Sequence, residues 1–186
     1  MLFRSIDPDA AMPTQAALSQ IDTYMKNGGT VLFDTRDQLL SGFDPASASP
    51  ATLRLRDMLA GMNVPALEPV PTDHVLTKAF FILQDFPGRY RGGPLWVEAN
   101  AKTEADPARP VRALDGVTPI MITGNDLAAA WAADEFGEPL YATVPSDPDQ
   151  RLYAYRAGVN IMMYALTGNY KSDQVHVPAL LERLGQ

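Results

Sequence analysis

Two short apolar runs that each end in a polar turn constrain the fold of this chain most strongly. Residues 30–34 read TVLFD, and residues 118–123 read TPIMIT and lead into a turn that contains Asn125 and Asp126. Runs this short and this apolar are typical of strands buried on both faces of a parallel sheet. Because each run adjoins a segment with helical periodicity, the sequence predicts strands that alternate with helices.

Capping residues mark the ends of the predicted helices. Ser49-Pro50 is a helix start, with serine as the N-cap and proline in the first turn, and Gly28 and Gly168 stand where helices end. We predict helices over residues 13–27, 51–60, 127–133, 151–167 and 177–184, and strands over residues 2–3, 30–34, 95–99 and 118–123. The longest helix is apolar along Leu152, Tyr155, Val159, Met162, Met163 and Leu166. Residues 64–71 hold three prolines and are predicted to be irregular.

This order of elements predicts a three-layer α/β fold in which helices cover both faces of a mostly parallel sheet. The length of 186 residues suits one domain, and 46% hydrophobic residues suffice for a full core. We therefore expect residues 1–186 to form a single domain. No stretch approaches the roughly 20 apolar residues that span a bilayer. We expect a soluble domain that does not itself insert into a membrane.

Charge and composition narrow the classes of function. A formal net charge of -7 with only 15 Lys and Arg leaves too few cations for a basic nucleic-acid-binding face. The chain has no cysteine, which removes thiol nucleophiles, disulfides and cysteine-based zinc sites. It also lacks a G-x-S-x-G elbow and a G-x-x-x-x-G-K-[ST] phosphate loop. We expect no nucleic-acid partner, no cofactor and no bound metal.

Polar side chains follow both buried strands. Asp34, Arg36 and Asp37 come after the first strand, and Asn125 and Asp126 come after the second. Ligands of open α/β sheets bind at the carboxyl ends of strands, so we expect these residues to lie at one edge. The carboxylates could bind a hard cation, and Arg36 could hold a carboxylate or phosphate unless it pairs with Asp37. These five residues are candidate ligand-binding residues.

The same residues also have structural explanations. Asp34 can accept hydrogen bonds from the turn after it, and Asn125 or Asp126 can cap the helix that follows. Trp131, a further ligand-binding candidate, can line a pocket or belong to the core. Asn160 lies in an apolar helix and is predicted to tie that helix to a neighbouring loop. We assign no catalytic residue.

The two histidines offer little support for catalysis. His74 follows Asp73, so an oriented base can be imagined, with Thr72 and Thr77 as the nearby hydroxyls. We favour Asp73 as a helix cap and His74 as a partly buried surface residue. His176 lies in a polar tail and is predicted to be solvated.

Four stretches in this order resemble a bacterial domain family of unknown function. They are residues 24–37 (YMKNGGTVLFDTRD), 73–81 (DHVLTKAFF), 119–131 (PIMITGNDLAAAW) and 155–168 (YRAGVNIMMYALTG). That family often forms the C-terminal domain of large membrane proteins whose N-terminal part is like Bat-type aerotolerance proteins. Its fold is similar to class I glutamine amidotransferases. The resemblance implies a glutamine amidotransferase-like or flavodoxin-like domain that is tethered to the membrane as part of a longer protein. It does not specify the side of the membrane on which the domain lies.

The chain departs from that pattern in two respects. Glutamine amidotransferases use a Cys-His-Glu triad, and this chain has no cysteine to take that role. Such domains also have a further strand and helix before the position of Leu2, so we expect the chain to be truncated at its N-terminus.

Three functions remain open at this point. The one that we favour is a non-catalytic domain that binds a small ligand or a protein partner for a larger membrane-anchored protein. The second is a carboxylate-dependent hydrolase in which Asp34, Asp37 and Asp126 act either as metal ligands or as acid/base groups and Arg36 holds an anionic substrate. The third is an assembly surface, with homodimerisation through a strand edge or a core face that the truncated start leaves bare. Carboxylates that converge on an open pocket would favour the hydrolase, and carboxylates held by backbone amides would favour the binding domain.

Overall fold

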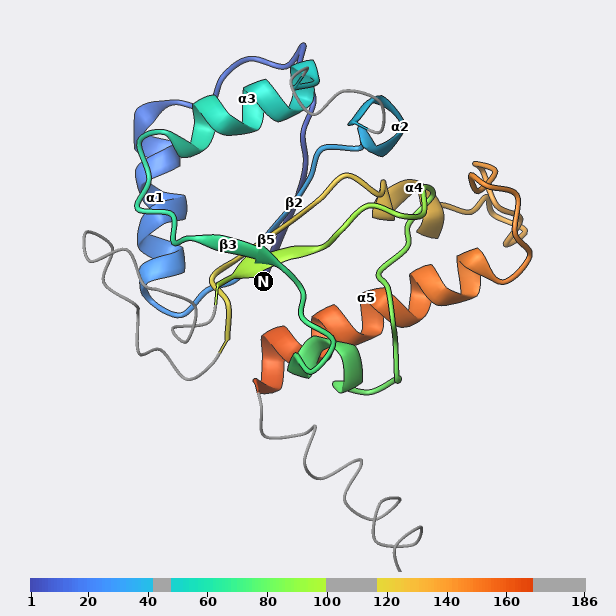
Figure 1. Ribbon diagram of the computed structural model, residues 1–186. Helices are drawn as coiled ribbons and strands as arrows, with labels where there is room; N and C mark the ends of the chain where they lie inside the picture. Colours follow the sequence, from blue (N-terminus) through green and yellow to red (C-terminus); the bar gives the residue numbers. More distant parts are fainter. Residues whose placement is uncertain (42–47, 100–116, 169–186) are drawn as a thin grey trace, which may run out of the picture.

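A five-stranded open sheet forms the centre of the protein (Figure 1). The computed structural model describes residues 1–41, 48–99 and 117–168. The strands follow the order β1-β2-β5-β4-β3, and their bounds are β1 Leu2–Ser5, β2 Val31–Asp34, β3 Leu67–Pro69, β4 Trp96–Glu98 and β5 Ile120–Thr123. β1, β2 and β5 are parallel neighbours, whereas β4 pairs antiparallel with β5 and β3 antiparallel with β4. The α/β class is confirmed, and the sheet is mixed because β4 runs against the other four strands.

The helices begin largely where their capping residues predicted. Their bounds are α1 Gln15–Lys26, α2 Gln38–Ser41, α3 Pro50–Leu59, α4 Leu127–Trp131 and α5 Gln150–Thr167, with a 3₁₀ helix, η1, at Val75–Lys78. The Ser49 hydroxyl accepts a hydrogen bond from the Thr52 amide at 3.0 Å, which confirms the predicted start of α3. Gly28 follows α1 with a φ of +87°, as a glycine at a helix end should. α4 is two residues shorter than predicted, and α2 was not predicted.

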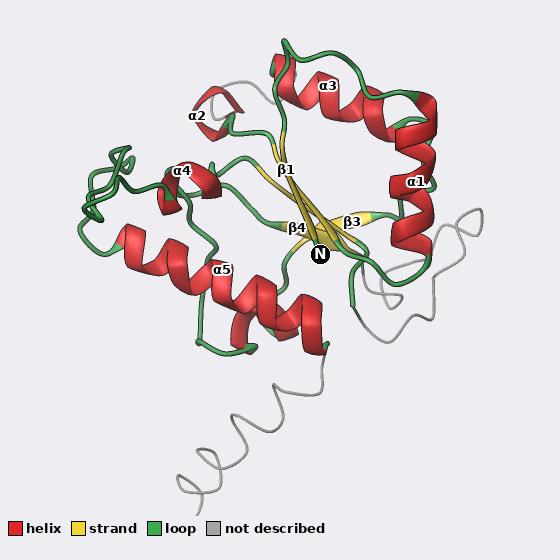
Figure 2. Ribbon diagram, turned by 180° about the vertical axis from the view of Figure 1, so that it is seen from behind, coloured by secondary structure: helices red, strands yellow, loops and turns green. Residues whose placement is uncertain are grey.

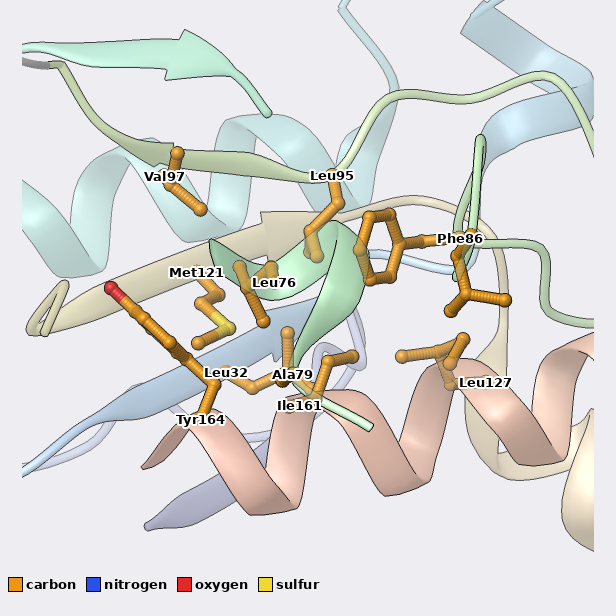
Figure 3. Packing of buried hydrophobic residues seen from close by; sticks show 12 residues of the cluster. Leu32, Leu76, Ala79, Phe86, Leu95, Val97, Met121, Leu127, Ile161 and Tyr164 are labelled. Atoms are coloured by element: carbon orange, nitrogen blue, oxygen red, sulfur yellow. The ribbon is translucent and has the colours of Figure 1, made fainter. Parts of the chain in front are cut away.

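Helices cover both faces of the sheet (Figures 1 and 2). α1 and α3 pack on the face to which Phe33 and Ile120 point, while η1, α4 and α5 pack on the face of Leu32 and Met121. Successive residues of β2 and β5 therefore belong to two separate cores, which is why the first three residues of each strand are apolar. Figure 3 shows the second core, where Tyr164 of α5 reaches across to Met121 and Leu32.

The connection from β3 to β4 contains no crossover helix. Parallel neighbours need a crossover connection, usually a helix, and residues 70–95 contain only the single turn of η1. Asn160 of α5 holds this connection in place. Its Oδ1 accepts from the amides of Phe80 and Phe81, and its Nδ2 donates to the carbonyls of Leu76 and Phe81. The predicted tie from Asn160 to a neighbouring loop is confirmed.

Residues 64–71 are not irregular throughout, because β3 lies within them. Pro69 is compatible with this strand because β3 is at the edge of the sheet, where no neighbour requires its missing N–H. The predicted helix over residues 177–184 and His176 lie outside the described residues. Within the described part of the chain, no helix combines the length and the apolar character needed to cross a membrane.

Candidate functional site

The carboxyl ends of β2 and β5 meet at a topological switch point. The chain leaves β2 towards α3 on one face of the sheet, and it leaves β5 towards α4 and α5 on the other face (Figure 1). Asp34 and Thr123, the last residues of the two strands, are partners in the parallel register. In open α/β sheets the crevice at such a point is the usual place for a ligand. The two predicted clusters of polar residues come together here.

Asp34 is fully buried and serves as the anchor of this edge. Its Oδ1 accepts from the amides of Arg36 and Asp126, each at 3.1 Å, and its Oδ2 accepts from the amide of Leu127 at 2.7 Å. The carboxylate therefore both holds the turn after β2, as predicted, and satisfies amides at the start of α4. Asp126 occupies the N-cap position of α4, as predicted, but it has a φ of +56° and its side chain makes no capping hydrogen bond.

Burial also sets the protonation behaviour of this edge. Removal from water raises the pKa of Asp34 to about 6, although the three amide donors act in the opposite direction. Burial likewise raises the pKa of Asp126, while the nearby amide of Ala129 and the charges of Arg36 and Arg89 lower it. The Arg89 guanidinium lies 3.9 Å from Asp126 Oδ2. A carboxyl that titrates near neutrality is thus placed at the switch point.

Asp37 is buried in a cluster of hydroxyl groups. Its Oδ1 accepts from the Thr35 hydroxyl, and its Oδ2 accepts from Ser49 and, at 2.7 Å, from Thr52. Ser49 and Thr52 belong to the first turn of α3, so Asp37 joins the end of β2 to that helix. Gly124 is tightly enclosed here, since a Cβ on it would lie 2.8 Å from Asp37 Oδ1.

Arg36 and Trp131 make contacts within their own chain. The Arg36 side chain is exposed, and its Nη2 donates to the carbonyl of Ile6 at 2.9 Å. Trp131 is half-buried against the α5 core and donates its indole N–H to the carbonyl of Ala154 at 2.9 Å. These contacts give both residues a structural role.

Asn125 lies fully buried between β5 and the loop that precedes β4. Its Nδ2 donates to the carbonyls of Phe86 and Gly93, whereas its Oδ1 has no partner among the described residues. A Cβ on Gly93 would lie 2.4 Å from Asn125 Oδ1 and 2.2 Å from Gln38 Oε1, so both amides face the same glycine. Gln38 was not predicted as a site residue, because only the tertiary structure brings α2 beside Asn125.

An open groove of about 710 Å³ extends from this edge over the sheet. Its polar end is formed by Thr35, Asp37, Gln38, Thr52 and Thr123. The remainder passes between α3, β3 and β4, and its wall is mainly apolar: Leu55, Leu59, Ala60, Val64, Pro65, Ala66, Leu67, Pro94, Trp96 and Ile122, with Arg56 beside them. Its size and its apolar wall with few polar groups are typical of small-molecule sites.

Among the predicted ligand-binding residues, Asp37 alone lines this groove. Asp34, Asn125 and Asp126 lie behind it at the switch point, and their hydrogen bonds position the loops that form its polar end. The apolar wall was missed because Leu55 and Leu59 have the helical spacing of ordinary core residues. Nothing in that spacing distinguishes a core from a groove.

His74 caps η1 in place of the predicted Asp73. Its Nδ1 accepts from the Leu76 amide at 3.1 Å, and burial lowers its pKa. The Thr77 hydroxyl donates to the backbone carbonyl of His74 at 2.7 Å. This hydroxyl is therefore bonded to the backbone and not to the imidazole that would activate a nucleophile. In the described residues, no group of three or more His, Asp and Glu side chains is placed to hold a metal ion.

The fold and this edge define an α/β domain with a ligand-sized groove at its switch point. Residues 1–166 match a family model described as "Domain of unknown function (DUF4159)". The chain therefore belongs to the DUF4159 family, and the expected membership of a family of unknown function is confirmed. No curated protein matches the chain.

Proposed function

We propose that this chain is a non-catalytic binding domain that takes a small molecule in the groove beside α3. The observation that carries the proposal is that its buried carboxylates are already hydrogen-bonded within the chain. Asp34 accepts hydrogen bonds from three backbone amides and Asp37 from three hydroxyls, so both carboxylates have a structural role. Catalytic carboxylates need access to a substrate, and Asp34 is fully buried.

The groove supports a ligand with an apolar body and one polar group. Trp96, Ile122 and Leu67 offer a broad apolar surface, and burial of apolar area there would drive binding. Thr35, Gln38 and their neighbours at the other end offer hydroxyl and amide groups that can fix the orientation of the ligand.

The proposal extends to the wider architecture of the protein. The parallel β1-β2-β5 core with helices on both faces is compatible with a glutamine amidotransferase-like fold. Without a cysteine, such a fold would retain the crevice and lose the thiol chemistry. We further infer that the domain serves a larger membrane-anchored parent, as the resemblance of its sequence implies.

A neutral fluorophore, N-phenyl-1-naphthylamine, tests the proposed groove. It should bind the full chain saturably with one molecule per chain. Ala60→Trp fills the groove and should weaken binding at least fivefold, because Ala60 is part of the wall. Ala16→Trp on the exposed side of α1 is the matched control and should leave binding unchanged. Equal binding by both variants, or no saturable binding, would contradict the proposal.

One observation favours the alternative, a carboxylate-dependent hydrolase. The pKa of Asp34 is raised to about 6, in the range that suits an acid or base at neutral pH. Thermal melting with Mg²⁺, Mn²⁺ or Ca²⁺ separates the two functions. If the chain is a binding domain, these ions should not change its melting temperature. A clear rise in melting temperature, together with hydrolysis of a 4-nitrophenyl ester that Asp34→Asn abolishes, would establish the hydrolase.

A further inference from the structure

The outer side of α5 carries an exposed apolar stripe. Its members are Leu152, Tyr155, Val159, Met162 and Leu166, each between 40% and 69% exposed. They follow one another at intervals of three, four, three and four residues, which is the a/d spacing of a helix that pairs with another helix. The stripe is about 21 Å long at 1.5 Å per residue.

The stripe is separate from the side of α5 that builds the core. Ala154, Ala157, Ile161 and Tyr164 are buried against the sheet, so α5 is apolar on two sides. Single exposed apolar residues are normal on a protein surface, but a continuous row over four turns is typical of an interaction surface. The groove beside α3 lies on the opposite face of the sheet, so the two surfaces are independent.

The spacing is close to symmetric about Val159. Relative to Val159, the other members lie at -7, -4, +3 and +7. In an antiparallel pair of α5 helices related by a two-fold axis, Leu152 would face Leu166 of the second copy and Tyr155 would face Met162. Val159 would face its own counterpart at the axis. A two-fold axis requires such a self-complementary surface.

Charge does not oppose this self-pairing. α5 contains no acidic residue, and its two arginines are engaged within their own chain. Arg156 lies over the rings of Phe81 and Tyr153, and Arg151 donates to the carbonyls of Ala130 and Tyr141. Because both guanidinium groups already have partners within the chain, α5 offers no free charge to a second molecule. An uncharged surface, such as the same stripe of a second copy, therefore fits it.

From these observations we propose that the α5 stripe is the interface of a homodimer in which two copies of the chain pair through antiparallel α5 helices. The adjoining Trp131, whose carbonyl accepts from the Tyr155 hydroxyl, would lie at the rim of this interface. The expected assembly is a two-fold dimer, with both grooves facing away from the seam.

The absence of native cysteines makes a crosslinking test clean. Val159→Cys in the full chain should oxidise to a disulfide-linked dimer at least tenfold faster than Leu53→Cys, a control of similar exposure on α3. A mixture of Tyr155→Cys and Met162→Cys chains should crosslink, whereas each variant alone should not. Crosslinking of Tyr155→Cys with itself would indicate a parallel pair and overturn the proposed arrangement.

Sedimentation equilibrium provides the second measurement. The unmodified chain should show a concentration-dependent dimer, and Val159→Arg should weaken its association at least tenfold, because two like charges would meet at the axis. Circular dichroism of each variant checks that α5 is retained. A monomer at all concentrations, or equal crosslinking of Val159→Cys and Leu53→Cys, would overturn the proposal.

Discussion

Two buried asparagines, one in α5 and one at the switch point, behave differently. Asn160 in α5 makes four hydrogen bonds to the connection around η1 and has no remaining capacity. Asn125 at the switch point makes two through its amide nitrogen and leaves its Oδ1 without a partner among the described residues. Buried polar atoms in native proteins are almost always paired, and exceptions concentrate where function is located. The contrast separates a saturated structural tie from an edge that contains a buried polar atom without a partner among the described residues.

The saturated tie should give the largest effect. Asn160→Ala removes the partner of two amides and two carbonyls in buried or partly buried positions, so we expect a loss of about 4 kcal/mol in the free energy of unfolding. Urea denaturation measures the loss. Leu53→Ala, at an exposed position of α3, should cost less than about 1 kcal/mol. A loss below 1 kcal/mol for Asn160→Ala would mean that water or a shifted loop replaces the tie.

The Asp34 anchor should come next. Asp34→Ala removes the acceptor for three amides and should lower the free energy of unfolding by about 3 kcal/mol. The emission of Trp131 at the end of α4 should also report a local change. If Asp126→Ala proved equally damaging, the capping role assigned to Asp34 would be wrong.

The raised pKa of Asp34 predicts a dependence of stability on pH. The folded state holds this proton up to about pH 6, whereas the unfolded carboxyl releases it near 3.8. Stability from this group is therefore complete below about pH 4 and falls as the pH rises through 6, by about 3 kcal/mol. Urea midpoints compared with those of Asp34→Asn from pH 4 to 7 measure it. A wild-type stability that rises over this range relative to the variant would contradict it.

The smallest effect concerns the backbone at the switch point. Asp126 and Arg36 both have a φ of +56°, a conformation that favours glycine. Asp126→Gly and Arg36→Gly should therefore raise the free energy of unfolding, by about 0.5–1 kcal/mol each. Thermal melting can resolve this change. Destabilisation by Asp126→Gly alone would show that its weak pairing with Arg89 matters more than the backbone conformation.

Local chemistry made part of this structure predictable. Ser49-Pro50, Gly28 and Gly168 marked helix ends because capping depends on neighbouring residues. The apolar runs of β2 and β5 were recognisable because both of their faces are buried. β3 was missed because its three residues with a terminal proline carry no strand signal, and the antiparallel course of β4 depends on a connection that has no periodic pattern.

The apolar pattern of α5 was visible, but its orientation was not. The row from Leu152 to Leu166 has the larger apolar side chains, yet the structure buries Ala154, Ala157 and Ile161 against the sheet. Small residues allow a helix to approach a sheet closely, and only the packed arrangement shows which side does so.

The sequence by itself determined most of the element types, with β3 and α2 as exceptions, the location of the polar residues at strand ends and the absence of a cysteine thiol, because these depend on residue identity and short-range spacing. The tertiary structure alone decided that Asp34 satisfies the first amides of a helix 92 residues away, that Gln38 meets Asn125 and that a groove remains open beside α3. These features arise from contacts between distant segments, and no local pattern specifies which distant partner a side chain will meet.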